Sequence, residues 1–469
     1  MRLTPLIAGL TLAAASTLAV AAAVPPAHRA RAATGPARKD HALLHTIAGD
    51  VSAARLHATI AKLVSFGTRS TISETTSDTR GIGAARRWVK SQFEDYSHDC
   101  GGCLEIVTPS EMFSGKRYDK PTEVMDVVAI QRGTGDPDRV VVITGHLDSR
   151  NSDTMNTSKA APGANDDASG VAALMEAARV LSKHKFAATI VYSADSGEEQ
   201  GLDGGKVIVD YAKAHGWRVE ADLNNDIIGN SHGMNGVHDD THVRVFSEGT
   251  KAVETDAEAA RRRYNGGELD SPSRNLARYM EDLSARYVQG LSVKMIYRTD
   301  RYGRGGDQVR FLAEGYPAVR VTESAENYHR QHQDVRVENG IAYGDVISGV
   351  DFPYLAKVTR LNAVTLASLA AAPAPPEDVK IEGGVSDDTT MTWKAARGAA
   401  DYRVWWRATT EPTWSHVRSA GNATTLKLDN VIIDDWFFGV SSVSADGWES
   451  PVEYPGPAGS FVSASPPTK

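Results

Sequence analysis

Apolar residues recur along the chain in two rhythms, which predict two kinds of structure. Between residues 41 and 370, short apolar runs alternate with stretches whose apolar positions repeat every three or four residues. The run at 139–144 is largely β-branched, as expected of a buried central strand, and further runs follow at 189–192, 221–228 and 318–321. Strands that alternate with helices are typical of a mostly parallel mixed sheet with helices on both faces. We therefore predict an α/β domain over residues 41–370.

Two helical patterns have distinct places in this domain. One lies between the first two strand runs, and its apolar residues fall on one helix face: Val171, Leu174, Met175, Ala178 and Leu181. The other runs from Tyr343 to about Leu369. It predicts a long helix that closes the domain.

The pattern changes after residue 370. Residues 371–376 are all alanine and proline, which is typical of an extended linker. Short runs at 390–393, 402–407 and 436–443 then predict strands, with Gly, Asp and Asn turns between them. We therefore predict a C-terminal all-β sandwich over residues 377–463. Its early tryptophan and its closing segment make it similar to a fibronectin type III domain.

The N-terminus has the features of an export signal. Residues 1–24 contain an early arginine, an alanine- and leucine-rich stretch and small residues at the expected cleavage site. The alternative is a membrane anchor, but alanine is only weakly apolar and Pro5 interrupts the run. We therefore expect a secreted protein without a membrane attachment after cleavage. Residues 25–40 are rich in Pro, Ala, Gly and Arg and predict a disordered lead-in.

Composition narrows the class of protein. The 469 residues are 41% hydrophobic and 23% charged, with a formal net charge of -8. The only basic run is at 261–263, so nucleic acid is not expected as a partner. We expect the protein to be monomeric.

The two cysteines, Cys100 and Cys103, enclose two glycines. This spacing is compatible with a redox motif, half a zinc site or a disulfide. No second pair of cysteines exists to complete a zinc site, and an exported protein favours the disulfide. We predict that the disulfide closes a surface turn.

A histidine and an aspartate follow the strand at 139–144. Open α/β sheets bind ligands at the carboxyl ends of their strands, where His146 and Asp148 are expected. We interpret His146 as a metal ligand and Asp148 as the carboxylate that orients its second ring nitrogen. The alternative is an ordinary structural histidine at a strand end.

Two adjacent acids, Asp166 and Asp167, precede the helix that contains Val171. One acid would be enough to cap that helix. The small residues around the pair leave room for a metal, and a single carboxylate can bridge two ions through its two oxygens. We interpret this pair of acids as part of a metal site, with helix capping as the alternative.

Further carboxylates follow the next two strands. Glu198 and Glu199 lie in a loop after the strand at 189–192, and Asp226 lies near the end of the next strand. A pair of loop glutamates can be merely solvated, and Asp226 can be an ordinary strand-end residue. Alternatively, Glu199 binds metal while Glu198 moves a proton, because a general base must not itself be held by the metal. Carboxylates and histidines without thiolates suit a hydrolytic zinc site.

Four motifs together resemble a known family. They are Gly-His-x-Asp-Ser at 145–149, Pro-Gly-Ala-x-Asp-Asp-Ala-Ser-Gly at 162–170, Glu-Glu-x-Gly at 198–201 and the strand-end Asp226. This set resembles the co-catalytic di-zinc aminopeptidases of metallopeptidase family 28, which also includes carboxypeptidases and glutaminyl cyclases. The resemblance extends from about residue 63 to about residue 369. Residues 305–318 are similar to the family's substrate-proximal loop and helix.

The resemblance implies a role for each residue. One zinc ion would be held by His146 and Asp226. The other would be held by Glu199 and a late histidine. Asp166 would bridge the two Zn²⁺ ions, and Glu198 would be the general base for a water between them.

The late histidine is less clear than the other ligands. The family usually has a histidine four residues before an acid, whereas here His329 lies five residues before Asp334 and His332 lies two before it. We favour His332, because the sequence His-Gln-Asp-Val-Arg that begins there is similar to that of bacterial members. His329 is the alternative.

The implied activity is that of a secreted zinc aminopeptidase acting on peptides or proteins with free N-termini. Carboxypeptidase, glutaminyl cyclase or other amidohydrolase activity on the same scaffold are alternatives, as is an exported binding protein without catalysis. The C-terminal domain could contact a polymer or surface through its aromatic residues, or these could simply pack inside it. They are Trp405, Trp406, Trp414 and Trp448.

Overall fold

A central eight-stranded sheet organises residues 38–371 of the computed structural model. The structure describes residues 38–455 apart from 235 and 268, so the expected signal segment 1–24 lies outside it. The strand order is β1-β4-β6-β5-β7-β10-β8-β9. In that order the strands are β1 (Leu104–Val107), β4 (Val127–Gln131), β6 (Ala188–Asp195), β5 (Asp136–His146), β7 (Arg218–Asn225), β10 (Ala318–Glu323), β8 (His242–Ser247) and β9 (Ser292–Ile296).

The middle of this sheet is parallel. β5 pairs in parallel with β6 and with β7, and β7 pairs in parallel with β10. β8 and β9 also pair in parallel, whereas the remaining neighbours are antiparallel. The expected mixed α/β sheet is therefore confirmed. Four adjacent strands end at the same edge, which is where α/β sheets bind ligands.

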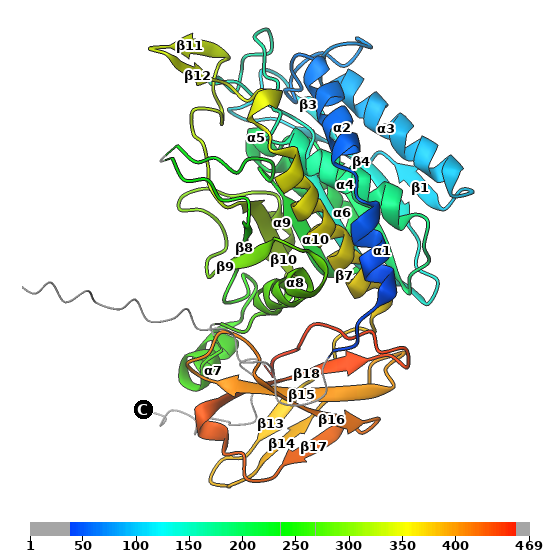
Figure 1. Cartoon of the computed structure of the whole chain (residues 1–469), viewed down its shortest axis with the longest axis vertical. Coiled ribbons are helices and arrows are strands. Elements are labelled where there is room, and N and C mark those ends of the chain that lie inside the picture. Colours follow the sequence, from blue (N-terminus) through cyan, green and yellow to red (C-terminus); the bar gives the residue numbers. More distant parts are fainter. Residues whose placement is uncertain (1–37, 235, 268, 456–469) are drawn as a thin grey trace, which may run out of the picture. The chain divides into compact units, whose positions relative to one another are not determined.

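Helices cover both faces of the sheet. Alternate residues of β5 point to opposite faces, because side chains alternate along a strand. Val141 and Ile143 join a large core with α1 (Ala42–Asp50), α2 (Ala53–Ser65), α3 (Gly81–Asp99), α4 (Ala168–Leu181), α8 (Pro272–Tyr287) and α10 (Phe352–Ala371). Val140 and Val142 join a smaller core with α6 (Asp203–Ala214) and α9 (Gln308–Ala313). In Figure 1 the first two helices, in blue, lie beside the long helix α10, in yellow.

The remaining short elements lie outside the main sheet. Two small hairpins are formed by β2 (Ser110–Phe113) with β3 (Thr122–Met125) and by β11 (Arg336–Glu338) with β12 (Ile341–Tyr343). The other helical pieces are α5 (Glu198–Gly201), α7 (Asp256–Asn265) and the 3-10 turns η1 (Ile347–Gly349) and η2 (Ile433–Asp435).

The helix expected from Tyr343 begins later than the apolar pattern suggests. Residues 341–343 form β12, and α10 starts at Phe352. Asp351 caps it by accepting the N–H of Tyr354, and a proline occupies its first turn, where a missing N–H costs nothing. Ile347 and Val350 pack against the core without belonging to an α-helix.

Two antiparallel three-stranded sheets form the C-terminal part. One has the order β13-β14-β17, with bounds Lys380–Glu382, Thr389–Thr392 and Thr425–Leu428. The other has the order β16-β15-β18, with bounds His416–Gly421, Asp401–Ala408 and Trp436–Val443. One apolar cluster contains Met391 and Leu428 from the first sheet with Val404 and Phe438 from the second. The two sheets therefore share a core, as expected of an all-β region.

The tryptophans of this region have packing partners. Trp405 and Trp406 are 6% and 8% exposed. Trp414 packs beside Trp405, and Trp448 stacks on His41 with ring centroids 3.6 Å apart. All four tryptophans therefore make packing contacts, in agreement with the alternative that they pack within the protein.

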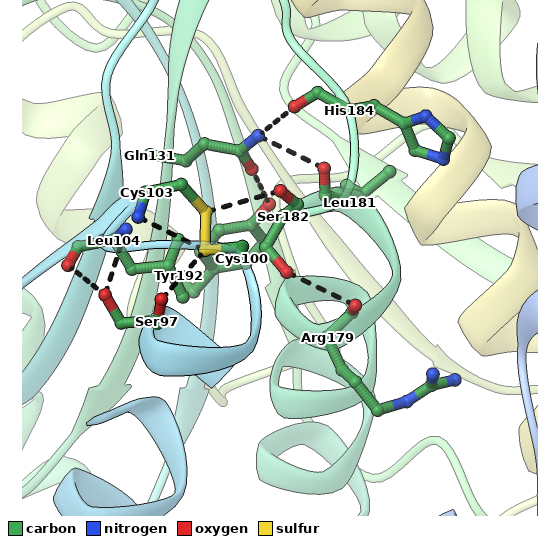
Figure 2. Close-up of a disulfide and its surroundings, with 10 residues drawn as sticks. All are labelled: Ser97, Cys100, Cys103, Leu104, Gln131, Arg179, Leu181, Ser182, His184 and Tyr192. Carbon is green, nitrogen blue, oxygen red and sulfur yellow. Dashed lines mark hydrogen bonds between the residues drawn. A yellow bond between two sulfur atoms is a disulfide. The ribbon is translucent and has the colours of Figure 1, made fainter. Parts of the chain in front are cut away.

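Cys100 and Cys103 form a disulfide at the turn between α3 and β1 (Figure 2). Gly101 and Gly102 between them have φ of 76° and 86°, a conformation that glycine adopts readily. The Ser97 hydroxyl donates to the carbonyl of Leu104 at 2.8 Å across the same turn. The disulfide therefore closes a tight local turn.

Within the described part of the chain, no helix is both long and apolar enough for a membrane span.

Candidate metal centre

The proposed ligands converge on the carboxyl edge of the parallel strands. His146 is the last residue of β5, Asp166 lies just before α4, and Asp226 directly follows β7. Glu199 lies in the single turn α5, after β6. His332 lies in the loop between β10 and β11. Residues far apart in the sequence thus meet because their strands end side by side.

These five residues form two groups that share Asp166. The first is His146, Asp166 and Asp226, and the second is Asp166, Glu199 and His332. Within each group, one possible ligand atom from every member lies within 4.8 Å of the others. This is the pairing that the sequence resemblance implied.

The distances show how Asp166 serves both groups. Its Oδ1 lies 3.1 Å from His146 Nε2, and its Oδ2 lies 3.1 Å from His332 Nε2. His332 Nε2 is also 3.1 Å from Glu199 Oε1. His146 Nε2 lies 4.0 Å from Asp226 Oδ1. A carboxylate with one oxygen toward each group can bridge two cations.

The donor atoms fit zinc. Nε2 of His146 and Oε1 of Glu199 are buried and make no hydrogen bond within the described residues. Buried polar atoms without a partner are rare and costly, so such atoms mark a place for an ion. Imidazole nitrogen and carboxylate oxygen are both usual zinc ligands. The four carboxylate and imidazole side chains other than His332 are almost fully buried, and His332 is 35% exposed.

The pKa values of two carboxyl groups at the centre are shifted in opposite directions. Burial by itself would raise the pKa of Asp166, but the nearby imidazoles of His146 and His332 hold that pKa well below its ordinary value. Burial raises the pKa of Glu198 well above its ordinary value, against the opposing effect of His146. Glu198 belongs to neither group of ligands, and a raised pKa suits a residue that exchanges a proton near neutral pH.

Asp148 connects the two halves of the centre. One carboxylate oxygen lies 3.4 Å from His146 Nδ1, which is also 3.1 Å from the Asp148 carbonyl. The carboxylate accepts the backbone N–H of Glu198 at 3.3 Å and of Glu199 at 3.2 Å. Asp148 therefore orients the imidazole and the turn that carries both glutamates.

The two adjacent aspartates have different partners. Asp167 accepts the N–H of Gly170 at 3.0 Å, which caps α4, and the N–H of His146 at 3.0 Å. Asp166 instead faces the two histidines. The peptide bond between these aspartates is cis. Asp167 therefore supplies the helix cap, which leaves the Asp166 carboxylate facing the two histidines.

Several supporting residues were not predicted from the sequence. Arg69 is fully buried and donates to the carbonyls of Leu147, Pro162 and Gly163. The Thr71 hydroxyl donates to Asp148 at 2.8 Å and accepts the N–H of Gly197 at 2.9 Å. Both residues come from the segment between α2 and α3, which has no sequence signal that points to the centre.

Two further supports approach from β10 and from the segment before α10. The side chain of Arg320 is fully buried, and its Nη2 lies 2.6 Å from Asp226 Oδ2. Asp345 accepts the backbone N–H groups of Asn165 and Asp166 at 2.9 and 2.7 Å. Arg320 could have been identified from the sequence, because it is an arginine inside the apolar run 318–321.

The alternative late histidine lies elsewhere. His329 belongs to neither ligand group, and its ring packs edge-on against Tyr343 at 4.9 Å between centroids. His332 has a left-handed backbone, with φ of 51°, and its Nε2 faces Asp166 and Glu199. Geometry therefore favours His332.

Comparison with known proteins identifies the family. A model described as peptidase family M28 matches residues 126–346. A probable zinc metalloprotease of Pyrenophora teres f. teres is 44% identical over 425 residues, which cover 88% of this chain and 87% of the relative. A second probable zinc metalloprotease, from Leptosphaeria maculans, is 44% identical over an alignment that covers 87% of this chain and 95% of that relative. The chain belongs to peptidase family M28.

Solved structures agree with the M28 assignment at the level of the fold. LapB of Legionella pneumophila has a TM-score of 0.52 and 21% identity, covering 71% of this chain and 76% of its own. The LapA aminopeptidase of the same organism has a TM-score of 0.51 and 20% identity, covering 72% and 77%. Membership of M28 confirms the expected class of the protein, a hydrolase of the zinc metallopeptidase type.

Proposed function

We propose that this M28 peptidase is a secreted aminopeptidase that uses two zinc ions. The observation that carries the proposal is the pair of ligand groups that share Asp166, with Glu198 near enough to interact electrostatically with both groups but a member of neither. His146 and Asp226 would hold one ion, and Glu199 and His332 the other. The choice of the amino end rests on the resemblance of the motifs at 145–149, 162–170 and 198–201 to co-catalytic aminopeptidases.

The protein residues around the centre account for the proton transfers. When bound, two zinc ions supply Lewis-acid polarisation of the scissile carbonyl and a lowered pKa for the attacking water. The Glu198 carboxylate accepts the proton of that water and passes it to the leaving amine. The Asp148 carboxylate accepts the backbone N–H of Glu198 and so holds that residue in place. The base therefore stays beside the centre without binding metal.

The ends of the substrate can be distinguished directly. We expect hydrolysis of an aminoacyl nitroanilide or a short peptide with a free N-terminus, and none after the N-terminus is acetylated. A chelator should abolish the activity, and two equivalents of zinc should restore it. Activity on acetylated peptides that requires a free carboxyl end would instead establish a carboxypeptidase. Release of ammonia from N-terminal glutamine without peptide cleavage would establish a glutaminyl cyclase.

Export and the C-terminal region form a second part of the proposal. We propose that residues 1–24 direct export, which agrees with the Cys100–Cys103 disulfide, since such bonds persist mainly outside the reducing cytosol.

The paired antiparallel sheets over residues 380–443 support a fibronectin type III-like domain at 377–463. We expect this region to bind polymeric substrates or surfaces and to take no part in catalysis. Deleting it should leave hydrolysis of a nitroanilide intact if the remainder folds, and should reduce binding to a polymer.

A further inference from the structure

A third group of possible ligands lies outside the metal centre. Among the described residues, His232, His238 and Asp351 place one ligand atom each within 4.8 Å of the others. Both histidines are exposed and Asp351 is partly buried. Within the described part of the chain, none of the three forms an ion pair with a ligand of the centre, and the proposed peptidase chemistry does not use them.

Local backbone geometry brings the two imidazoles together. His232 and His238 are bridge partners on two antiparallel stretches between β7 and β8. The flanking hydrogen bonds run from the N–H of Gly233 to Val237 and from the N–H of Asp239 to Ser231, at 2.8 and 2.9 Å. In such a pair the side chains are close, and here the ring centroids are 4.2 Å apart with the planes at 18°.

A hydroxyl group links the carboxylate to this pair. Ser231 donates to Asp351 Oδ2 at 2.6 Å, and its Oγ lies 3.1 Å from His232 Nδ1. Asp351 is fixed from the other side because its Oδ1 accepts the N–H of Tyr354 at 3.1 Å. Its own N–H donates to Gly229 at 2.7 Å. Partners of this kind orient the ligands of metal sites.

We propose that His232, His238 and Asp351 bind one divalent transition-metal ion of the zinc or copper class. Two imidazoles and one carboxylate suit Zn²⁺ or Cu²⁺, whereas Ca²⁺ and Mg²⁺ prefer oxygen ligands. The three residues come from the segment between β7 and β8 and from the start of α10. A bound ion would therefore tie that segment to the helix. Because both histidines are exposed, the ion would exchange with solvent more readily than ions in the buried centre.

The test compares zinc stoichiometry between the full-length protein and its variants. Equilibrium dialysis against a series of free Zn²⁺ concentrations should give one more bound ion in the wild type than in His232→Ala or His238→Ala. The side chain of His98 is 92% exposed and lies far from the site in sequence, so His98→Ala is the matched control and should keep the full number. Ser231→Ala should keep the ion but bind it about 10–100-fold more weakly.

The readout is a difference between variants, so it does not depend on how many ions the peptidase centre holds. Hydrolysis rates and circular dichroism should be the same in the wild type and all four variants, and His238→Gln provides a further variant if His238→Ala fails to fold. Equal zinc numbers in the wild type and His238→Ala would overturn the proposal. So would loss of an ion in His98→Ala.

Discussion

Nε2 of His332 lies 3.1 Å from Oε1 of Glu199, although the two residues come from distant parts of the chain. This contact, with the equal distance to Asp166, distinguishes His332 from His329, which packs against Tyr343 instead. We expect His332→Ala to lower zinc affinity by more than the roughly 10–100-fold that loss of a supporting partner costs. Metal analysis after dialysis measures the effect. His329→Ala is the control and should retain both zinc and activity; loss of zinc from it alone would reverse the assignment.

Replacing Glu198 should separate catalysis from metal binding. Glu198 stands beside the ligand groups without belonging to either, so Glu198→Gln removes a proton acceptor and leaves the ligands intact. We expect kcat to fall by about 10²–10⁴-fold, the usual contribution of a general base, with unchanged zinc content. The neighbouring change Glu199→Gln should instead lower zinc content. A Glu198→Gln protein with near-normal kcat would rule out this residue as the base.

Local patterns were sufficient to predict the sheet, and the family motifs pointed to the residues that meet in the two ligand groups. Val140 to Ile143 belong to a β-branched strand that ends at His146, and Glu199 and Asp226 also come soon after strands. The supports could not be predicted in this way. Thr71 and Asp345 act through hydrogen bonds to loops that only tertiary structure brings near them. The start of α10 was misplaced because Ile347 and Val350 continue the apolar spacing although the cap at Asp351 sets the boundary.

A buried ionic cluster predicts a large stability effect. The Asp270 carboxylate lies 2.8 Å from Arg278 Nη1 and 2.7 Å from Arg407 Nη2, and all three side chains are at most 4% exposed. Asp270→Ala would leave two buried guanidinium groups without this partner. We expect a loss of about 3–5 kcal/mol in the free energy of unfolding, measured by urea denaturation. The exposed pair Asp378–Lys394 is the control, and Lys394→Ala should give no measurable change.

Glu248 predicts a pH dependence of stability. Burial raises the pKa of this carboxyl from its ordinary 4.5 to about 7. Between these pH values the unfolded chain has lost the proton that the native chain still holds. The unfolded state then binds fewer protons, so stability falls as the pH rises from about 4.5 to about 7. We expect Glu248→Gln to remove on the order of 2 kcal/mol of this decline, measured as denaturation curves at pH 5 and pH 8. Parallel pH profiles for the two proteins would contradict this.

Arg69 and Thr71 precede the segment 126–346 that matches the family model, yet they hold its loops. Arg69 fixes the carbonyls of Leu147 and Gly163, and Thr71 joins Asp148 to Gly197. The smallest active fragment must therefore begin before residue 69. A fragment limited to residues 126–346 would contain every proposed ligand and the base, and would still lack side chains that keep them in position.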